Sequence, residues 1–305
     1  MPLIRWLLNV EPLWNTPEEF TQTLNYLPSS THSHVLKYFR PSDRKLALGS
    51  QILQHLLVSK FRNIPFRDVT IVRNFGGVQG GRPVFVGTDS GVEGLEYNVS
   101  HHGGVVAITS RLDPPREDGG GGKDVGGGIG VDVADYEQRP RYIEGNLAAV
   151  FEWADGFEQG GVFTRWEMEG ATGGLRGMAG DEEGQMEEVV KGVHLNWAVK
   201  EAYVKAVGTG LVTDLTAVEF GLEGVKETLD SGERSRGVQL WLGKGAERRE
   251  GSEWYFEVER VQREGLEGRY CVAIATKAEG LSEEDRQGRW EWLDYEEGIE
   301  PVLKA

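Results

Sequence analysis

The chain has 305 residues, which is enough for one large domain or two smaller ones with separate cores. Its 33 basic and 49 acidic residues give a formal net charge of −16, and a field of that sign repels nucleic acids and anionic membranes, so we expect binding to neither. Apolar residues make up 39% of the chain, which indicates a folded protein, yet no apolar run is long enough to cross a bilayer. The N-terminus lacks the regions of a signal peptide, and a single cysteine excludes an internal disulfide and a cysteine-based zinc site. We therefore expect a cytoplasmic protein.

The first half of the chain predicts a strand, two helices and four further strands. The first strand is expected over residues 3–10. Thr16 then combines with Pro17 and Glu19 in the pattern that caps and starts a helix. A longer helix is expected over residues 42–61, where leucine and isoleucine recur at helical spacing. Short β segments follow at residues 69–73, 83–86, 95–100 and 105–109.

Two glycine-rich stretches have neither a helical nor a strand period. Residues 116–130 contain eight glycines, and residues 156–192 contain ten. Neither stretch contains a phosphate-binding glycine motif. We therefore expect both to be solvated loops or disordered insertions rather than parts of a core.

The second half repeats the order of the first. A strand over residues 129–133 and a helix over residues 194–207 are expected first. Segments rich in β-branched and aromatic residues follow at 217–222, 238–242, 254–261 and 270–276. A helix followed by strands, twice, predicts an α+β protein of two similar lobes. We place the first lobe at residues 1–125 and the second at 126–305, with the stretch at about 156–192 as an insertion in the second.

A predicted strand ends in Ser100-His101-His102, turns through two glycines and returns as a strand. A ligand can approach the backbone closely at such a hairpin tip. Neighbours on a strand point to opposite faces, so at most one histidine would serve a site, and most histidines are structural. An acyltransferase H-H-x-x-x-D motif is incomplete here, because Val106 stands where its aspartate is required. A zinc site is poorly supported, since the next histidine, His194, is distant and no cysteine assists.

Asp132 lies in a short predicted strand, with Gly130 and Ala134 on its own face and apolar residues on the other. The small neighbours leave room beside the carboxylate for a ligand or an ion. The alternative is an ordinary solvent-facing aspartate on an edge strand, and this segment alone favours that alternative.

Trp197, Glu201 and Lys205 recur at every fourth position of the expected helix and share a face with two alanines. A Glu–Lys pair at this spacing is commonly a surface ion pair worth about 0.3–0.5 kcal/mol. Charges on a face that also carries tryptophan and alanine need partners, because burial of an unpaired charge is costly. A polyanion and a metal ion would supply both partners.

Five segments, in this order, resemble the 4′-phosphopantetheinyl transferases of the surfactin-synthetase-activating type, in a pattern closest to the fungal and animal members. They are G-R-P at residues 81–83, N-V-S-H at 98–101, G-V-D-V at 130–133, F-T-R-W-E at 163–167 and W-A-V-K-E-A-Y-V-K-A-V-G-T-G-L at 197–211. The last segment is long and specific, whereas G-x-D alone would be weak.

This resemblance implies a pseudo-twofold α+β fold, with an antiparallel sheet and a packed long helix in each lobe and coenzyme A bound between the lobes. It implies holo-[acyl-carrier-protein] synthase activity, in which the 4′-phosphopantetheine of coenzyme A passes to a serine of an apo acyl or peptidyl carrier protein and 3′,5′-ADP leaves. The implied cofactor is Mg²⁺, with Mn²⁺ as an alternative. The implied partners are coenzyme A and a carrier protein, which is usually acidic, and a monomer is expected.

By the same resemblance, Asp132 and Glu201 hold the metal, which suits a hard cation that prefers carboxylates and phosphate oxygens. The implied catalytic residues are Glu201, which accepts the serine proton directly or through a metal-associated water, Lys205, which neutralises the departing ADP, and His101, which stabilises phosphoryl charge. The implied coenzyme A-binding residues are Arg73, Arg82, Ser100, His101, Lys200 and Lys205.

Two features depart from the bacterial members of this family. Ala134 stands where some of them carry a further metal-binding glutamate; animal members also lack it, and a water would fill that coordination position. Ser30 and Ser33 align with lysines that clasp the 3′-phosphate of coenzyme A. The candidates to replace those lysines are His32, His34, Lys37 and Arg40.

One rival hypothesis is a non-catalytic coenzyme A-binding scaffold protein that has kept the fold. Retention of both metal carboxylates and of Lys205 favours the enzyme. The acceptors stay open among the carriers of fatty acid, polyketide and nonribosomal peptide synthesis and an aminoadipate reductase of lysine biosynthesis.

Overall fold

The computed structural model describes residues 3–74, 82–85, 95–112, 128–140, 143, 145–208, 214–244, 247–266 and 269–304, with the backbone alone described at 72–74, 82–85 and 112. Within this part of the chain, no helix is both long enough and apolar enough to pass through a membrane.

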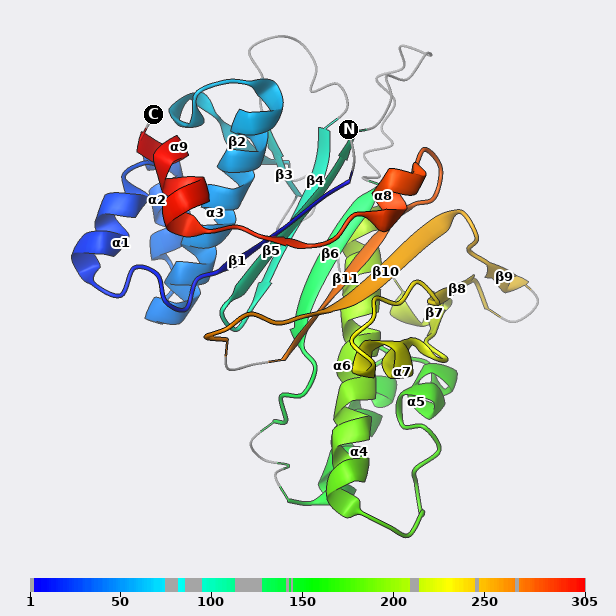
Figure 1. Cartoon of the computed structure of the whole chain (residues 1–305). Helices are drawn as coiled ribbons and strands as arrows, with labels where there is room; N and C mark the ends of the chain where they lie inside the picture. The colour runs from blue at the N-terminus through cyan, green and yellow to red at the C-terminus, as the bar shows by residue number, and fades with distance from the viewer. Residues whose placement is uncertain are drawn as a thin grey trace.

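A four-stranded sheet with one long helix forms the first half of the molecule (Figure 1). The strand order is β12 (Glu291–Trp292), β1 (Ile4–Asn9), β5 (Val105–Leu112) and β4 (Leu95–His102). All neighbours are antiparallel except β12, which runs parallel to β1. Helix α3 (Pro41–Arg62) buries its leucine face against alternate side chains of these strands. This burial of apolar surface is the core of the first half.

A three-stranded antiparallel sheet with a second long helix forms the other half. Its order is β10 (Trp254–Val261), β11 (Tyr270–Lys277) and β6 (Ile129–Asp135). Helix α6 (Glu182–Val207) packs on one face through its alanines and Tyr203.

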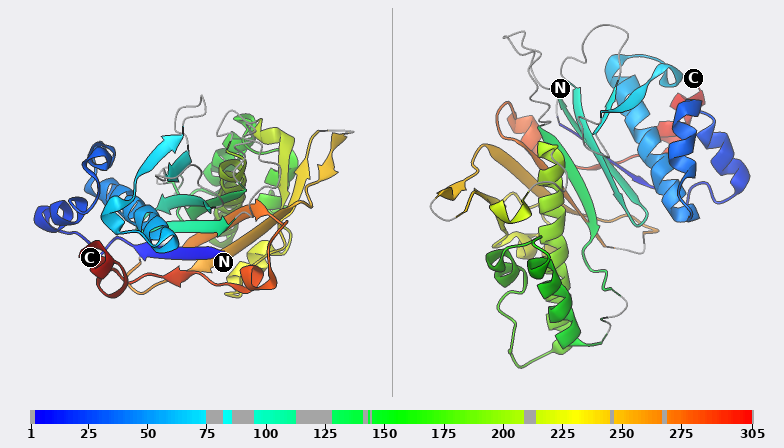
Figure 2. Two further views of the ribbon diagram at one scale, coloured as in Figure 1. Left: turned by 90° about the horizontal axis from the view of Figure 1, so that it is seen from above. Right: turned by 180° about the vertical axis from the view of Figure 1, so that it is seen from behind.

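The remaining faces of the two sheets pack against each other. Leu7, Val105 and Ala107 from the first sheet share a cluster with alternate apolar residues of β6 and β11. Helices α3 and α6 therefore lie on outward faces, and both are visible from behind with strands between them (Figure 2). Strand β6 lies beside the edge strand β4, because the backbone N–H of Val131 donates to Oδ1 of Asn98 over 3.1 Å.

Smaller elements complete the described part of the chain. Two further antiparallel groups pair β2 (Ile71–Asn74) with β3 (Arg82–Phe85), and β8 (Gln239–Leu242) with both β7 (Val218–Gly221) and β9 (Arg249–Glu250). The other α-helices are α1 (Pro17–Leu24), α2 (Ser29–Leu36), α4 (Leu147–Gln159), α5 (Arg165–Ala171), α7 (Val225–Asp230), α8 (Glu283–Gln287) and α9 (Glu300–Lys304). Short turns of other helix types lie at Phe66–Asp68, Leu215–Ala217 and Tyr295–Ile299.

The local predictions for the first half are confirmed. Thr16 caps α1: its side chain accepts from the N–H of Glu19 over 3.2 Å, and the Glu19 carboxylate accepts from the N–H of Thr16. The helix expected over residues 42–61 is α3, and each expected strand overlaps an observed one. Capping and periodicity are properties of neighbours in sequence, so they are readable without tertiary information.

The prediction of a solvated or disordered insertion at 156–192 is wrong. The stretch holds the end of α4, all of α5 and the start of α6, which extends well before the expected residue 194. These helices bury Phe163, Met168 and Met186 in a core of their own. Several glycines in the stretch serve turns, but Gly192 serves packing: a Cβ there would lie 2.0 Å from the carbonyl oxygen of Ala171. Most of the other stretch, residues 113–127, lies outside the described residues.

The fold is mixed α/β, with antiparallel sheets and packed helices, as expected. The twofold relation between lobes and the boundary at 125/126 stay predictions. The C-terminal residues pack on the first half: β12 extends the sheet beside β1, and Leu293, Ile299 and Leu303 join the core under α3 (Figure 1). A two-residue strand carries too little pattern to predict which sheet edge it joins.

Candidate functional site

Lys205, in the last turn of α6, joins the helix to strands β4 and β6. Its Nζ donates to Oδ1 of Asp132 over 2.6 Å, to Oγ of Ser100 over 2.9 Å and to the carbonyl oxygen of Val131 over 3.2 Å. The Lys205 side chain keeps 27% of its surface exposed, so the cation can reach a ligand from solvent. Ser100, Asp132 and Lys205, each predicted for the site, therefore lie within hydrogen-bond distance of one another.

Gly130 explains how α6 comes so close to β6. A Cβ at Gly130 would lie 2.0 Å from the carbonyl oxygen of Ala202 and 2.5 Å from the backbone nitrogen of Ala206. Real Cβ atoms do not approach backbone so closely, so a glycine is required at this position. The space that Gly130 leaves is therefore filled by the helix. Our expectation that it makes room for a ligand or an ion is wrong.

Asp132 is 6% exposed and is held by two donors on one oxygen. Oγ of Ser100 donates to Oδ1 of Asp132 over 2.8 Å, and Lys205 donates to the same atom. Both contacts use Oδ1, which leaves Oδ2 to act as a ligand. The alternative of a solvent-facing edge aspartate is excluded, because β6 lies between α6 and the first sheet.

Glu201 lies one helical turn before Lys205, and its carboxylate interacts electrostatically with that of Asp132. Burial raises the pKa of the Glu201 carboxyl, the Lys205 cation lowers it, and the nearby Asp132 carboxylate raises it again. Among the described residues, no group donates a hydrogen bond to the Glu201 side chain. Two carboxylates with mutual repulsion suit a hard divalent cation, which relieves that repulsion.

No group of three or more His, Cys, Asp or Glu side chains that could hold a metal occurs within the described ranges. A cation at Asp132 and Glu201 would therefore take its other ligands from water or phosphate oxygens, as Mg²⁺ commonly does. The donor set present fits the predicted ion.

The two adjacent histidines point to opposite faces, as alternation on a strand requires. Desolvation by the surrounding protein, followed by the Lys205 cation, lowers the pKa of the His101 imidazole, although its side chain keeps an exposed surface. Asp43, in the first turn of α3, acts on the same imidazole with the opposite sign. His102 instead lies 3.5 Å from Oε1 of Gln138, and its ring meets the edge of Tyr270. Only His101 faces the charged group at Asp132.

The sequence did not predict a structural role for Asn98. Its side-chain oxygen accepts from the N–H of Val131, which fixes the edge of β4 against β6. Asn98 lies two residues before Ser100, and Val131 lies one residue before Asp132. The signal was present, since Asn98 opens the N-V-S-H segment, but an asparagine in a strand carries no pattern that names a partner on another sheet.

Lys200 does not join this group. It is 2% exposed, and its Nζ donates to Oε2 of Glu167 over 2.8 Å and to the carbonyl oxygens of Val162 and Leu215. Burial raises the pKa of Glu167 and lowers that of Lys200, while their attraction opposes both shifts. The expected coenzyme A contact of Lys200 is therefore replaced by a core ion pair, which links α6 to α5.

Arg73 and Arg82 lie on paired strands. In the hairpin of β2 and β3, Arg73 is opposite Pro83 and Arg82 is opposite Asn74. Their side chains lie outside the described residues, so their roles toward coenzyme A stay predictions.

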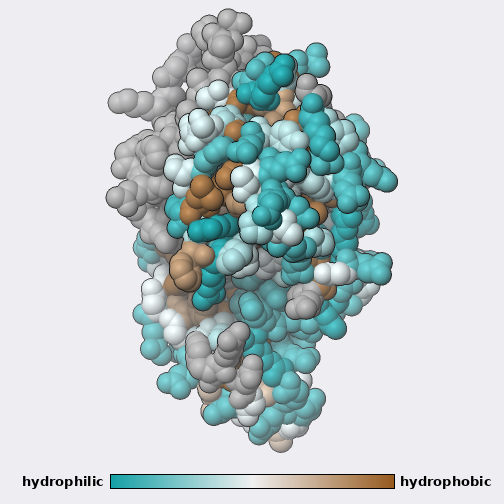
Figure 3. Space-filling model, turned by 90° about the vertical axis from the view of Figure 1, so that its left-hand side faces the viewer, coloured by the Kyte–Doolittle hydropathy of each residue, from teal (hydrophilic) through white to brown (hydrophobic). Residues whose placement is uncertain are grey.

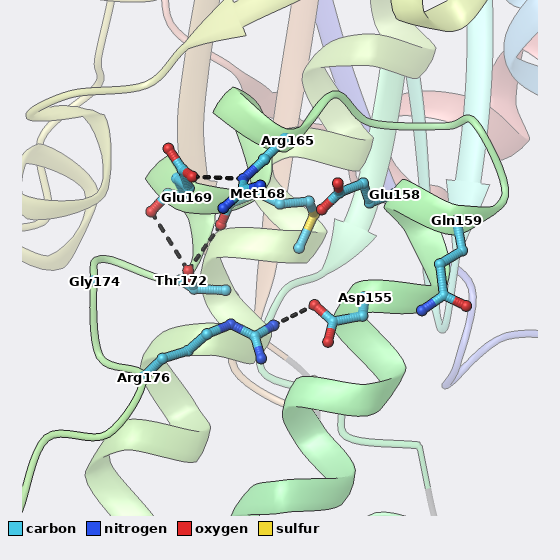
Figure 4. Close-up of a pocket in the computed structure, with 9 residues that line it drawn as sticks. All are labelled: Asp155, Glu158, Gln159, Arg165, Met168, Glu169, Thr172, Gly174 and Arg176. Carbon is cyan, nitrogen blue, oxygen red and sulfur yellow. Dashed lines mark hydrogen bonds and ion pairs between the residues drawn. The ribbon is translucent and has the colours of Figure 1, made fainter.

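Two cavities lie away from this group, on either side of α5. One of about 410 Å³ contains the ion pairs Arg176–Asp155 and Arg165–Glu169 (Figure 4). The other, of about 420 Å³, lies between α5, α6 and the turn after β7. Neither is lined by a residue predicted for the site, and both arginines that line the first are already paired with carboxylates.

The known proteins to which this chain is similar include several phosphopantetheinyl transferases. A family model described as 4′-phosphopantetheinyl transferase, N-terminal, matches residues 13–113. The chain is 28% identical over 261 residues to 4′-phosphopantetheinyl transferase 1 of Fusarium mangiferae, covering 79% of this chain and 82% of that protein. It is 26% identical to 4′-phosphopantetheinyl transferase NpgA of Emericella nidulans, over 94% and 85% of the two chains. It is 23% identical to the L-aminoadipate-semialdehyde dehydrogenase-phosphopantetheinyl transferase of Pongo abelii, over 92% and 77%.

Proposed function

Because the chain belongs to the 4′-phosphopantetheinyl transferase family, in its fungal and animal type, we propose that it transfers 4′-phosphopantetheine from coenzyme A to a serine of apo acyl or peptidyl carrier proteins. The observation that carries this proposal is the meeting of Asp132, Glu201 and Lys205 beside Ser100 and His101. Those residues come from three segments of the chain, β4, β6 and α6, and supply both signs of charge that a diphosphate and a cation need.

Asp132 and Glu201 would hold Mg²⁺ or Mn²⁺. A cation bound there would neutralise negative charge on the diphosphate while its phosphoanhydride bond breaks. The proposal is supported by the repulsion between the two carboxylates and by the absence of a hydrogen-bond donor to Glu201 among the described residues.

The transfer forms one bond and breaks one. The carrier serine Oγ attacks the phosphorus that bears pantetheine, the phosphoanhydride P–O bond breaks, and 3′,5′-ADP leaves. Glu201 accepts the serine proton. Burial raises the pKa of Glu201, which makes the carboxylate a stronger base near neutral pH.

Lys205 and His101 stabilise the charge that develops. The Lys205 ammonium group supplies a positive charge for the departing ADP. Desolvation and the Lys205 cation lower the pKa of His101, which favours the neutral imidazole, and a neutral imidazole can stabilise phosphoryl charge through a donated N–H. A bound diphosphate would raise that pKa again, because an anion favours the charged form. Ser100 holds Asp132 and Lys205 in register, and Arg73 and Arg82 would bind the adenine and phosphate end.

A mass measurement tests the function. The protein is incubated with coenzyme A, Mg²⁺ and an apo carrier, and the carrier is weighed. We expect a gain of one phosphopantetheine, and no gain after chelation of the metal. An unchanged carrier mass, with coenzyme A still bound to the protein, would favour the scaffold hypothesis. An aminoadipate-semialdehyde dehydrogenase belongs in the panel of acceptors, because the names of the animal relatives contain that enzyme.

A further inference from the structure

We propose that the α2–α3 corner, defined as residues 36–40, is the surface on which the acidic face of the carrier protein docks. This inference rests on the proposed function, since it assigns a place to the partner of that reaction. The corner carries exposed apolar side chains, exposed cations and a position beside His101.

Phe39 is the most exposed large apolar side chain within the described ranges, at 93%, and Leu36 in the same corner is 44% exposed. The other two exposed large apolar side chains, Trp166 and Met178, lie elsewhere. A single surface leucine requires no explanation, but an aromatic ring held almost wholly in water is the kind of residue that anchors an interface. Its burial by a partner would remove apolar surface from water.

The corner is cationic in an acidic protein. Lys37 and Arg40 flank Phe39 and are both exposed, whereas the whole chain carries a net charge of −16. A local basic patch attracts acidic surfaces and repels basic ones. Complementary charge also raises the rate of association. An acidic carrier protein has the chemistry that this corner recognises.

Two contacts hold the corner in one shape. The Lys37 ammonium lies 5.0 Å from the centre of the Tyr38 ring. Nε of Arg44 donates to the carbonyl oxygen of Tyr38 over 2.7 Å, which ties the corner to the first turn of α3. A preformed surface loses less entropy on binding than a flexible one. Figure 3 views the side of the molecule that bears α1 and α2, where hydrophobic residues are scattered among hydrophilic ones.

The corner also lies near the reacting groups. Asp43 follows it by three residues and acts electrostatically on His101, at the end of β4. A carrier seated on the corner would therefore have its serine near His101. A site for coenzyme A itself is the competing assignment, and the test separates the two.

Direct binding tests the docking surface without chemistry. A fluorescently labelled apo acyl carrier protein, with its acceptor serine replaced by alanine, is titrated with the full-length protein. We expect Phe39→Ser to weaken binding roughly tenfold or more, as for an aromatic anchor. Lys37→Glu and Arg40→Glu should weaken binding and flatten its dependence on salt. The control Met178→Ser removes another exposed apolar side chain, 58% exposed, and should leave binding unchanged.

The outcomes are distinct. Equal binding by wild type and Phe39→Ser overturns the inference. A raised KM for coenzyme A, with carrier binding unchanged, also overturns it and assigns the corner to coenzyme A. If wild type transfers no phosphopantetheine but Phe39→Ser still weakens carrier binding, the proposed function fails and the docking surface stands. A circular dichroism melt of each variant checks the fold, which replacement of a side chain so exposed should not disturb.

Discussion

Nζ of Lys205 lies 2.6 Å from Oδ1 of Asp132, so the last turn of α6 and the middle of β6 share a charged contact between residues 73 positions apart. Asp132 is nearly buried while Lys205 keeps contact with solvent. The pair is thus anchored on the side of Asp132 and accessible from solvent on the side of Lys205.

Asp132→Asn should lower the rate of transfer by roughly 10²-fold. Asparagine preserves the acceptor for Ser100 and Lys205 but removes the negative charge that a cation needs. The rate is measured against Mg²⁺ concentration, and the apparent affinity for Mg²⁺ should fall as well. Asp135→Asn, at the end of the same strand, is the control and should keep the wild-type dependence. An Asp132→Asn enzyme with wild-type turnover would remove Asp132 from the metal site.

The acid limb of the pH–rate profile should move in opposite directions in two variants. In the proposed mechanism Glu201 acts as a carboxylate, and its pKa is raised by burial, lowered by Lys205 and raised by Asp132. Lys205→Met removes the cation, so the pKa of Glu201 rises and activity is lost at a higher pH. Asp132→Asn removes the repelling charge, so the pKa of Glu201 falls and the limb moves to lower pH. Residual rates and an NMR titration of Glu201 measure both shifts; shifts of the same sign would refute the assigned causes.

Glu167→Gln should lower the free energy of unfolding by about 3 kcal/mol. It leaves the Lys200 ammonium buried without a countercharge, and both side chains are almost fully buried. Urea unfolding measures the change, while the KM for coenzyme A of the folded enzyme should stay near the wild-type value. Glu169→Gln, on the same helix, breaks an exposed pair with Arg165 and should change stability little. An altered KM for coenzyme A in Glu167→Gln would return Lys200 to the binding site.

Gly130→Ala should destabilise the protein by about 2 kcal/mol or more, because the new Cβ meets the backbone of α6 rather than a movable side chain. The displaced helix should also carry Lys205 away from Asp132 and reduce transfer. Gly156→Ala in α4 is the matched control: nothing lies within 4 Å of its Cβ, and the change should stabilise the helix by about 1 kcal/mol. Thermal unfolding of both variants decides the matter. Equal stability of Gly130→Ala and wild type would show that α6 can move without cost.

The elements were predictable where one segment carried its own signal. The Thr16 cap, the leucine period of α3 and the alternation that separates His101 from His102 are all local patterns. The prediction for residues 156–192 failed because it gave more weight to the glycines than to a helix-capping pattern in the same stretch. Thr164 and Glu167 form a capping box that starts α5, and the same T-x-x-E pattern marks helix starts in general.

The site was predictable in part. The sequence named Asp132, Glu201 and Lys205 as candidates, and the structure brings their charges together, while their roles stay predictions. Lys200 was placed wrongly, because a lysine beside a motif residue gives no sign of whether its ammonium group faces a ligand or a buried carboxylate. Asn98 was missed for a related reason: its partner, Val131, lies on a different sheet.

The sequence by itself determined the elements with a strong local pattern, which side chains of a strand share a face, and which carboxylates and cations are candidates for a site. Tertiary structure alone decided that Gly130 accommodates a helix, that Lys200 pairs with Glu167 in the core, and that the C-terminal strand returns to β1. The physical reason is the separation along the chain of the residues that interact. Capping and periodicity depend on residues within a few positions of each other, whereas burial and pairing depend on atoms that only the folded chain brings within a few ångströms.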